Sequence, residues 1–178
     1  MKFQPLVLVV GRPDFYQKVK EFFDKPCHEL HGHLDTTCSI CSVVGKVRIT
    51  CVETGRIAVE ALSGIIPDLI VVDGAEVFDR EDYKIRGIER ILEIMNFVRG
   101  ESPFSTMAVA VDKMTELRRL EKDGILFFPR NATLKEVRLI IGGNLKEMKE
   151  ARDANERDYP KETRDDFTPP EARIMPRH

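Results

Sequence analysis

Metal-ligand side chains are concentrated in one short stretch of the chain. Residues 27–41, CHELHGHLDTTCSIC, contain three of the four cysteines and three of the four histidines of the 178-residue sequence. Thiolates and imidazoles are the side chains that bind zinc in proteins, and a Cys-x-x-Cys spacing lets two thiolates reach the same ion. The stretch therefore predicts a metal site, with zinc as the expected ion because mixed Cys/His coordination suits it.

Four side chains of this stretch form the expected ligand set. Cys38 and Cys41 are the first pair, because two intervening residues let both thiolates point at one ion. Cys27 is the expected third ligand. His31 is the expected fourth ligand, with His33 as the alternative. A complete shell of four protein ligands is typical of a structural zinc site rather than an open catalytic site.

Two other uses of these cysteines stay open. An iron–sulfur cluster would take its four thiolates from Cys27, Cys38, Cys41 and Cys51. Against this, residues 47–52 alternate as a strand does, so that Cys51 would face the core. A redox enzyme would use the Cys38-x-x-Cys41 dithiol, but a reactive cysteine is favoured at the start of a helix, and the residues around this pair do not predict a long one.

Composition restricts the class of protein. The chain is 42% hydrophobic and 33% charged, and its formal net charge is −2. A near-neutral chain without a basic stripe argues against a general nucleic-acid binder. We find no signal-peptide pattern and no apolar stretch that approaches the span of a membrane. We therefore expect a cytoplasmic protein with reduced cysteines, which favours metal binding over a disulfide.

Apolar and amphipathic segments alternate along the first 150 residues. Short apolar runs predict five strands, and helical spacing of apolar residues predicts five helices. The expected strands are 6–10, 47–52, 69–73, 107–111 and 125–128, and the expected helices are 15–23, 55–62, 87–98, 115–122 and 134–148. This alternation predicts an α/β fold with a doubly wound, five-stranded parallel sheet. In such sheets the functional edge lies beyond the carboxyl ends of the strands.

The length of the chain favours one domain with two additions. We expect the α/β domain at residues 1–149. Within it, residues 26–46 form a Cys/His-rich, metal-binding insertion after the first helix. Residues 150–178 are polar, charged and proline-containing, which predicts a flexible C-terminal extension.

The order of these elements resembles the receiver domain of two-component response regulators, a flavodoxin-like (CheY-like) fold. Residues 67–73, PDLIVVD, look like the third strand of that family and place Asp73 at its phospho-acceptor position. Residues 55–62 resemble the start of its second helix, and residues 122–130 resemble its fifth strand with the following loop. The similarity covers roughly residues 5–145.

Three places depart from the pattern of that family. Gly11 and Arg12 stand where two acidic residues hold magnesium, and residues 111–112 are Val and Asp where Thr or Ser contacts the phosphoryl group. Arg130 takes the place of a lysine. Phosphoryl transfer to an aspartate depends on metal-assisted charge neutralisation, so magnesium is not expected to bind. We therefore expect Asp73 to be inactive and to pair with Arg12.

The resemblance and its departures together imply a pseudo-receiver. Such a protein is a signalling or scaffolding module rather than an enzyme. It would bind protein partners of a signalling pathway, or a second copy of itself, and metal in residues 26–46 would stabilise or switch it. Two alternatives stay open. One is a phosphorylatable response regulator that accepts phosphate on Asp73, and the other is the Cys38-x-x-Cys41 redox or metal-dependent enzyme.

Overall fold

The computed structural model describes residues 4–24, 47–74, 87–102, 105–112 and 124–158. These ranges contain, in chain order, β1 (Leu6–Val10), α1 (Pro13–Asp24), β2 (Arg48–Val52), α4 (Gly55–Leu62), β3 (Leu69–Asp73), α5 (Gly87–Glu101), β4 (Thr106–Val111), β5 (Ile125–Pro129) and α7 (Leu134–Asp158). The expected metal ligands and the helix expected at 115–122 lie outside the described residues.

The five strands form one parallel sheet in the order β2-β1-β3-β4-β5. The chain moves outward from β1 to β2, then crosses to the other side of β1 to form β3, β4 and β5. The point where the direction reverses lies between β1 and β3, and ligand sites of doubly wound sheets favour this position. The predicted fold class is confirmed, and each expected strand lies within one residue of the observed one.

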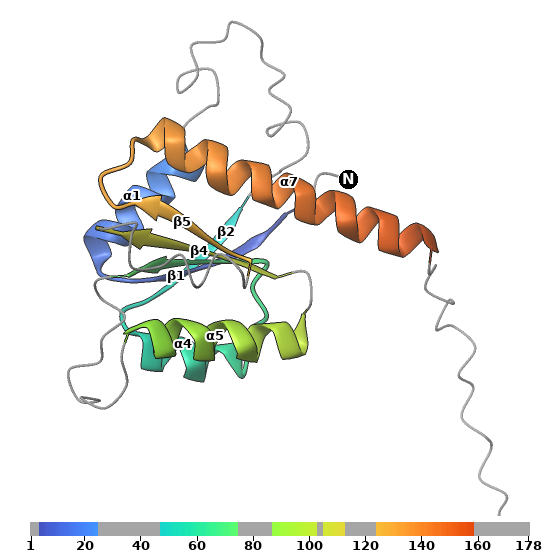
Figure 1. Cartoon of the computed structure of the whole chain (residues 1–178), viewed down its shortest axis with the longest axis horizontal. Helices are drawn as coiled ribbons and strands as arrows, with labels where there is room; N and C mark the ends of the chain where they lie inside the picture. Colours follow the sequence, from blue (N-terminus) through green and yellow to red (C-terminus); the bar gives the residue numbers. More distant parts are fainter. Residues whose placement is uncertain (1–3, 25–46, 75–86, 103–104, 113–123, 159–178) are drawn as a thin grey trace, which may run out of the picture.

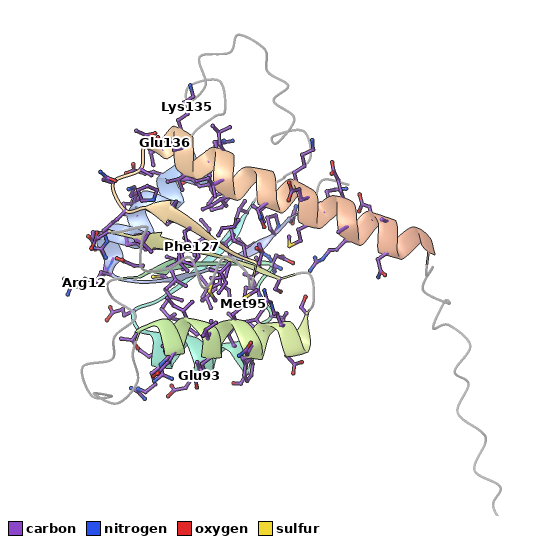
Figure 2. The ribbon with its side chains drawn as sticks, viewed as in Figure 1. Arg12, Glu93, Met95, Phe127, Lys135 and Glu136 are labelled. Atoms are coloured by element: carbon purple, nitrogen blue, oxygen red, sulfur yellow. The ribbon has the colours of Figure 1, made fainter. Side chains whose placement is uncertain are left out.

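Helices cover both faces of the sheet (Figure 1), with α1 and α7 on one face and α4 and α5 on the other. Successive residues of β3 point to opposite faces, because the side chains of a strand alternate. Ile70 packs in the core under α4 and α5, and Val71 packs in the core under α1 and α7. On β5, Phe127 belongs to the α5 side together with Met95 (Figure 2). A strand buried on both faces explains the continuous apolar runs of the sequence.

A reciprocal cap fixes the start of α7. The backbone N–H and the hydroxyl of Thr133 donate to Oε2 of Glu136 at 2.8 and 2.9 Å, and the Glu136 N–H donates to the Thr133 hydroxyl oxygen at 3.3 Å. This arrangement is a capping box. The helix then runs through Gly142 and Gly143 without a break. Each glycine costs about 1 kcal/mol relative to alanine, and the buried face outweighs it with Val137, Ile141, Leu145 and Met148.

The helix α7 continues to Asp158, past Met148, where the sequence predicts its end. Its distal part carries ion pairs between successive turns, such as Lys149 with Asp153. Arg152 contacts the body of the protein, because its Nη2 lies 2.7 Å from Oδ1 of Asp68. Ordered contacts with the sheet thus reach beyond the domain boundary expected at residue 149. Neither α7 nor another helix in the described ranges combines the length and the apolar character that a membrane crossing needs.

Candidate functional site

An arginine lies between two aspartates at the carboxyl edge of the sheet. Asp73, the last residue of β3, is 4% exposed and forms an ion pair with Arg130, which follows β5. The Nε of Arg130 also lies 3.8 Å from Oδ1 of Asp112, which follows β4 and is exposed. The three residues meet because β3, β4 and β5 are parallel neighbours whose carboxyl ends share one edge.

Backbone hydrogen bonds hold Arg130 in this position from two sides. Its N–H donates to the carbonyl oxygen of Val111 at 2.9 Å. Its own carbonyl oxygen accepts a hydrogen bond of 2.7 Å from Nζ of Lys18, on α1. Val111, Asp112, Arg130 and Asn131 line an open depression of about 300 Å³ beside the pair. The cation next to Asp73 is therefore part of a built loop rather than a loose surface side chain.

Neighbouring atoms leave no room for a side chain at two glycines near Asp73. A Cβ atom added at Gly11 would lie 2.9 Å from Cβ of Asp73 and 2.9 Å from Cδ1 of Phe15. A Cβ atom at Gly74 would lie 2.5 Å from the carbonyl oxygen of Ala110. Contacts this short require the neighbouring atoms to move. An acidic residue does not fit at position 11 of this structure without such a movement.

A cation that the structure pairs with Asp73 is Arg130, directly after β5, whereas the sequence predicts Arg12 as the partner. Arg12 is exposed and lies at the periphery of the molecule in Figure 2. The expectation that an arginine neutralises Asp73 is met by Arg130. The signal that could have identified Arg130 is its position directly after the fifth strand, where the resembling family has a lysine.

Cys51 occupies a core position. Its side chain, on β2, is half-buried against the core under α1 and α7, and its Sγ lies 3.7 Å from the carbonyl oxygen of Gly11. Burial raises the pKa of the Cys51 thiol, and the charge of Glu53 raises it further. Because the thiolate is the form that binds metals, this environment disfavours Cys51 as a ligand of an iron–sulfur cluster.

The other expected metal ligands are not placed by the structure. Cys27, His31, His33, Cys38 and Cys41 all lie in residues 25–46, outside the described ranges. Among the residues that are described, no three His, Cys, Asp or Glu side chains come together in a way that could hold a metal ion. Zinc coordination by the insertion therefore stays a prediction.

Comparison with known proteins identifies the fold. No protein-family model and no curated protein matches the sequence. Among solved structures, the chain is similar to the signal receiver domain of a Luxo repressor protein from Vibrio parahaemolyticus, with a TM-score of 0.56, 15% identity, and coverage of 85% of this chain and 98% of that one. It is also similar to the receiver domain of the Francisella response regulator 1452, with a TM-score of 0.51, 17% identity, and coverage of 82% and 99%.

A longer protein contains the same fold as one part. NtrX from Brucella abortus is similar over 88% of this chain but only 30% of its own, with a TM-score of 0.59 and 15% identity. The fold of this chain is thus the receiver fold, as the resemblance of the sequence implies. Because one fold can carry many functions, the function has to be argued from the carboxyl edge of the sheet.

Proposed function

We propose that this chain is a pseudo-receiver, a non-catalytic signalling module that does not accept phosphate and acts by binding proteins. The observation that carries the proposal is the ion pair between buried Asp73 and Arg130, with Gly11 packed against the aspartate. A receiver that accepts phosphate needs carboxylates that hold magnesium beside the acceptor. Here a glycine and an arginine occupy those positions, and the acceptor carboxylate already has a cationic partner.

A second candidate is a response regulator that is phosphorylated on Asp73. The position of Arg130 favours it, because a guanidinium beside the acceptor can make two parallel hydrogen bonds to a phosphoryl group. This candidate needs magnesium or another source of charge neutralisation. The two candidates therefore differ in whether a small phosphodonor with magnesium labels the protein.

Intact-mass measurement after incubation with acetyl phosphate and Mg²⁺ separates the two candidates. We expect no added phosphoryl group on the unmodified protein. Arg12→Asp is the matched variant. It restores one of the two acidic side chains of the receiver pattern at an exposed position and leaves Gly11 unchanged. Labelling of the unmodified protein that Asp73→Asn abolishes would overturn the pseudo-receiver proposal and support the phosphorylatable regulator.

We further propose that the insertion binds zinc, as a structural or regulatory ion, through Cys27, Cys38, Cys41 and His31 or His33. The density of ligand types supports this proposal, and the core position of Cys51 weakens the four-cysteine iron–sulfur alternative. A reducing, cytoplasmic setting is part of the proposal, because the ligands must stay thiols.

Elemental analysis of protein purified without chelator tests the metal proposal. We expect about one zinc ion per chain, the number that one tetrahedral four-ligand shell holds. Absence of transition metals would overturn the proposal, and visible absorption would redirect it to an iron–sulfur cluster. A metal-free Cys38–Cys41 disulfide would support the redox enzyme instead.

The proposed mode of action is binding of protein partners or of a second copy of the chain. The likeness to receiver domains supports this proposal as an analogy of fold. Pull-down with the purified domain and measurement of its oligomeric state by light scattering test the two forms of the proposal separately.

A further inference from the structure

Strand β3 is bounded by two buried carboxylates, and both pair with arginines from the C-terminal part of the chain. Asp68 directly precedes the strand and is 9% exposed, and Asp73 ends it. Asp73 pairs with Arg130, which lies in the short turn before α7. Asp68 pairs with Arg152, in the distal part of α7. Ion pairs at the amino and the carboxyl end of β3 thus connect this strand to the distal part of α7 and to the turn before the helix.

Asp68 is the fixed partner of its pair. Its Oδ2 accepts a hydrogen bond of 2.7 Å from the Leu6 N–H, and its backbone N–H donates to the carbonyl oxygen of Leu6 at 2.8 Å. Its own carbonyl oxygen accepts from the Thr106 N–H at 3.1 Å. Three strands therefore set the position of the carboxylate. Arg152 is about one-third exposed, so opening of the ion pair would move Arg152 away from Asp68.

The pair stands where apolar packing of α7 ends. The buried face of the helix runs through Leu145 and Met148, and the next turn of that face brings Arg152 over the amino edge of the sheet. Before and after Arg152 in the helix, Ala151 and Ala154 are exposed. The distal part of α7 therefore relies on a charged contact where the proximal part relies on burial.

We propose that Asp68 and Arg152 form a latch that holds residues 149–158 on the amino edge of the sheet. We further infer that α7 acts as a strut, so that the state of Asp73 at one edge changes the latch at the other. The turn from Arg130 to Leu134 is short, and the Thr133–Glu136 cap joins it rigidly to the helix. A shift of Arg130 would therefore move the whole helix rather than bend it locally.

The proposal goes beyond the pseudo-receiver function and does not require it. Any event that removes the charge of Asp73 would break its ion pair with Arg130, whether that event is modification, protonation or substitution. Such coupling needs two sites and an element that joins them, and Asp73, the latch and α7 are proposed for these parts. The coupling would change the position of Asp158, the last residue of α7, from which the rest of the chain continues.

Hydrogen exchange followed by mass spectrometry on the full chain tests the latch. We expect Arg152→Gln and Asp68→Asn each to speed amide exchange in 149–158 by about tenfold, which corresponds to about 1.4 kcal/mol of local opening. Asp68→Asn keeps an oxygen that accepts from the Leu6 N–H, so the fold is retained. Arg152→Lys should restore part of the protection, and Lys149→Gln, which removes a pair within the helix, is the matched control.

A second comparison tests the strut. Asp73→Asn should speed exchange in 130–134 and also in 149–158, and it should add little to the effect of Arg152→Gln in the distal part. Exchange in 149–158 that stays at the wild-type rate in both Arg152→Gln and Asp68→Asn overturns the latch. If exchange in 149–158 rises in Arg152→Gln and Asp68→Asn but not in Asp73→Asn, the strut is overturned.

Discussion

Replacement of Gly11 by alanine tests the packing that keeps an acidic residue away from Asp73. The added methyl carbon would lie 2.9 Å from Cβ of Asp73 and from Cδ1 of Phe15, whereas ordinary contacts are 3.4–4 Å long. Both neighbours resist displacement, because Phe15 is buried in the core and Asp73 is paired with Arg130. Overpacking of this kind costs about 1–3 kcal/mol of folding free energy, and we expect Gly11→Ala to lose that amount.

Gly143→Ala is the matched control. It adds the same methyl group in the middle of α7, where nothing lies within 4 Å of the new atom. Alanine is the better helix former by about 1 kcal/mol, so this variant should gain up to that amount. The two variants should therefore differ by roughly 1–4 kcal/mol.

Urea unfolding followed by far-UV circular dichroism measures this difference, since the chain has no tryptophan. We expect the midpoint to fall for Gly11→Ala and to rise for Gly143→Ala, with the slope unchanged. A Gly11→Ala protein as stable as the wild type would refute the reasoning, because the space beside Asp73 would then accept a side chain. In that case Gly11→Asp combined with Arg12→Asp could restore magnesium binding, which the packing otherwise opposes.

The other predictions concern the start of α7 and the insertion. Thr133→Ala should lower the stability of the protein by about 1 kcal/mol through loss of the capping box, as urea unfolding will measure. Hydrogen bonds from Thr133 lower the pKa of Glu136, so its stabilising effect is present at neutral pH and is lost as the pH falls below about 4.3, the ordinary glutamate value. The stability difference between wild type and Glu136→Gln should accordingly narrow from pH 6 to pH 3, and a constant difference would contradict this assignment. Cys38→Ser or Cys41→Ser should release zinc and raise hydrogen exchange in residues 26–46 alone, whereas cooperative loss of the whole fold would show that the metal site is part of the core.

The strands could be predicted from the sequence because burial on both faces leaves an unambiguous pattern. Each residue of β3 faces one of two cores, so its apolar run has no polar interruption before Asp73. The end of α7 could not be predicted in the same way. The apolar period stops at Met148, and the contact of Arg152 beyond it depends on Asp68, which is remote in the sequence and close only in the folded sheet.

Arg130 as a partner of Asp73 was missed for a related reason. The resemblance to receiver domains favours Arg12, because it stands where that family has an acidic residue near the acceptor. In the folded protein, hydrogen bonds with Lys18 and Val111 hold the loop of Arg130 beside Asp73. Such hydrogen bonds between distant segments leave no periodic signal in the sequence.

A permanent cation at the carboxyl edge constrains where a switch in this protein can act. A guanidinium stays charged at all physiological pH values, so Arg130 neutralises Asp73 continuously, whereas bound magnesium comes and goes. In a pseudo-receiver, phosphorylation of Asp73 is therefore not the input. Helix α1 leads directly into residues 26–46, and its end is tied to α7, because Nη1 of buried Arg138 donates to the carbonyl oxygen of Phe22 at 3.0 Å. A metal-dependent change in the insertion would reach α7 through this contact without passing through Asp73.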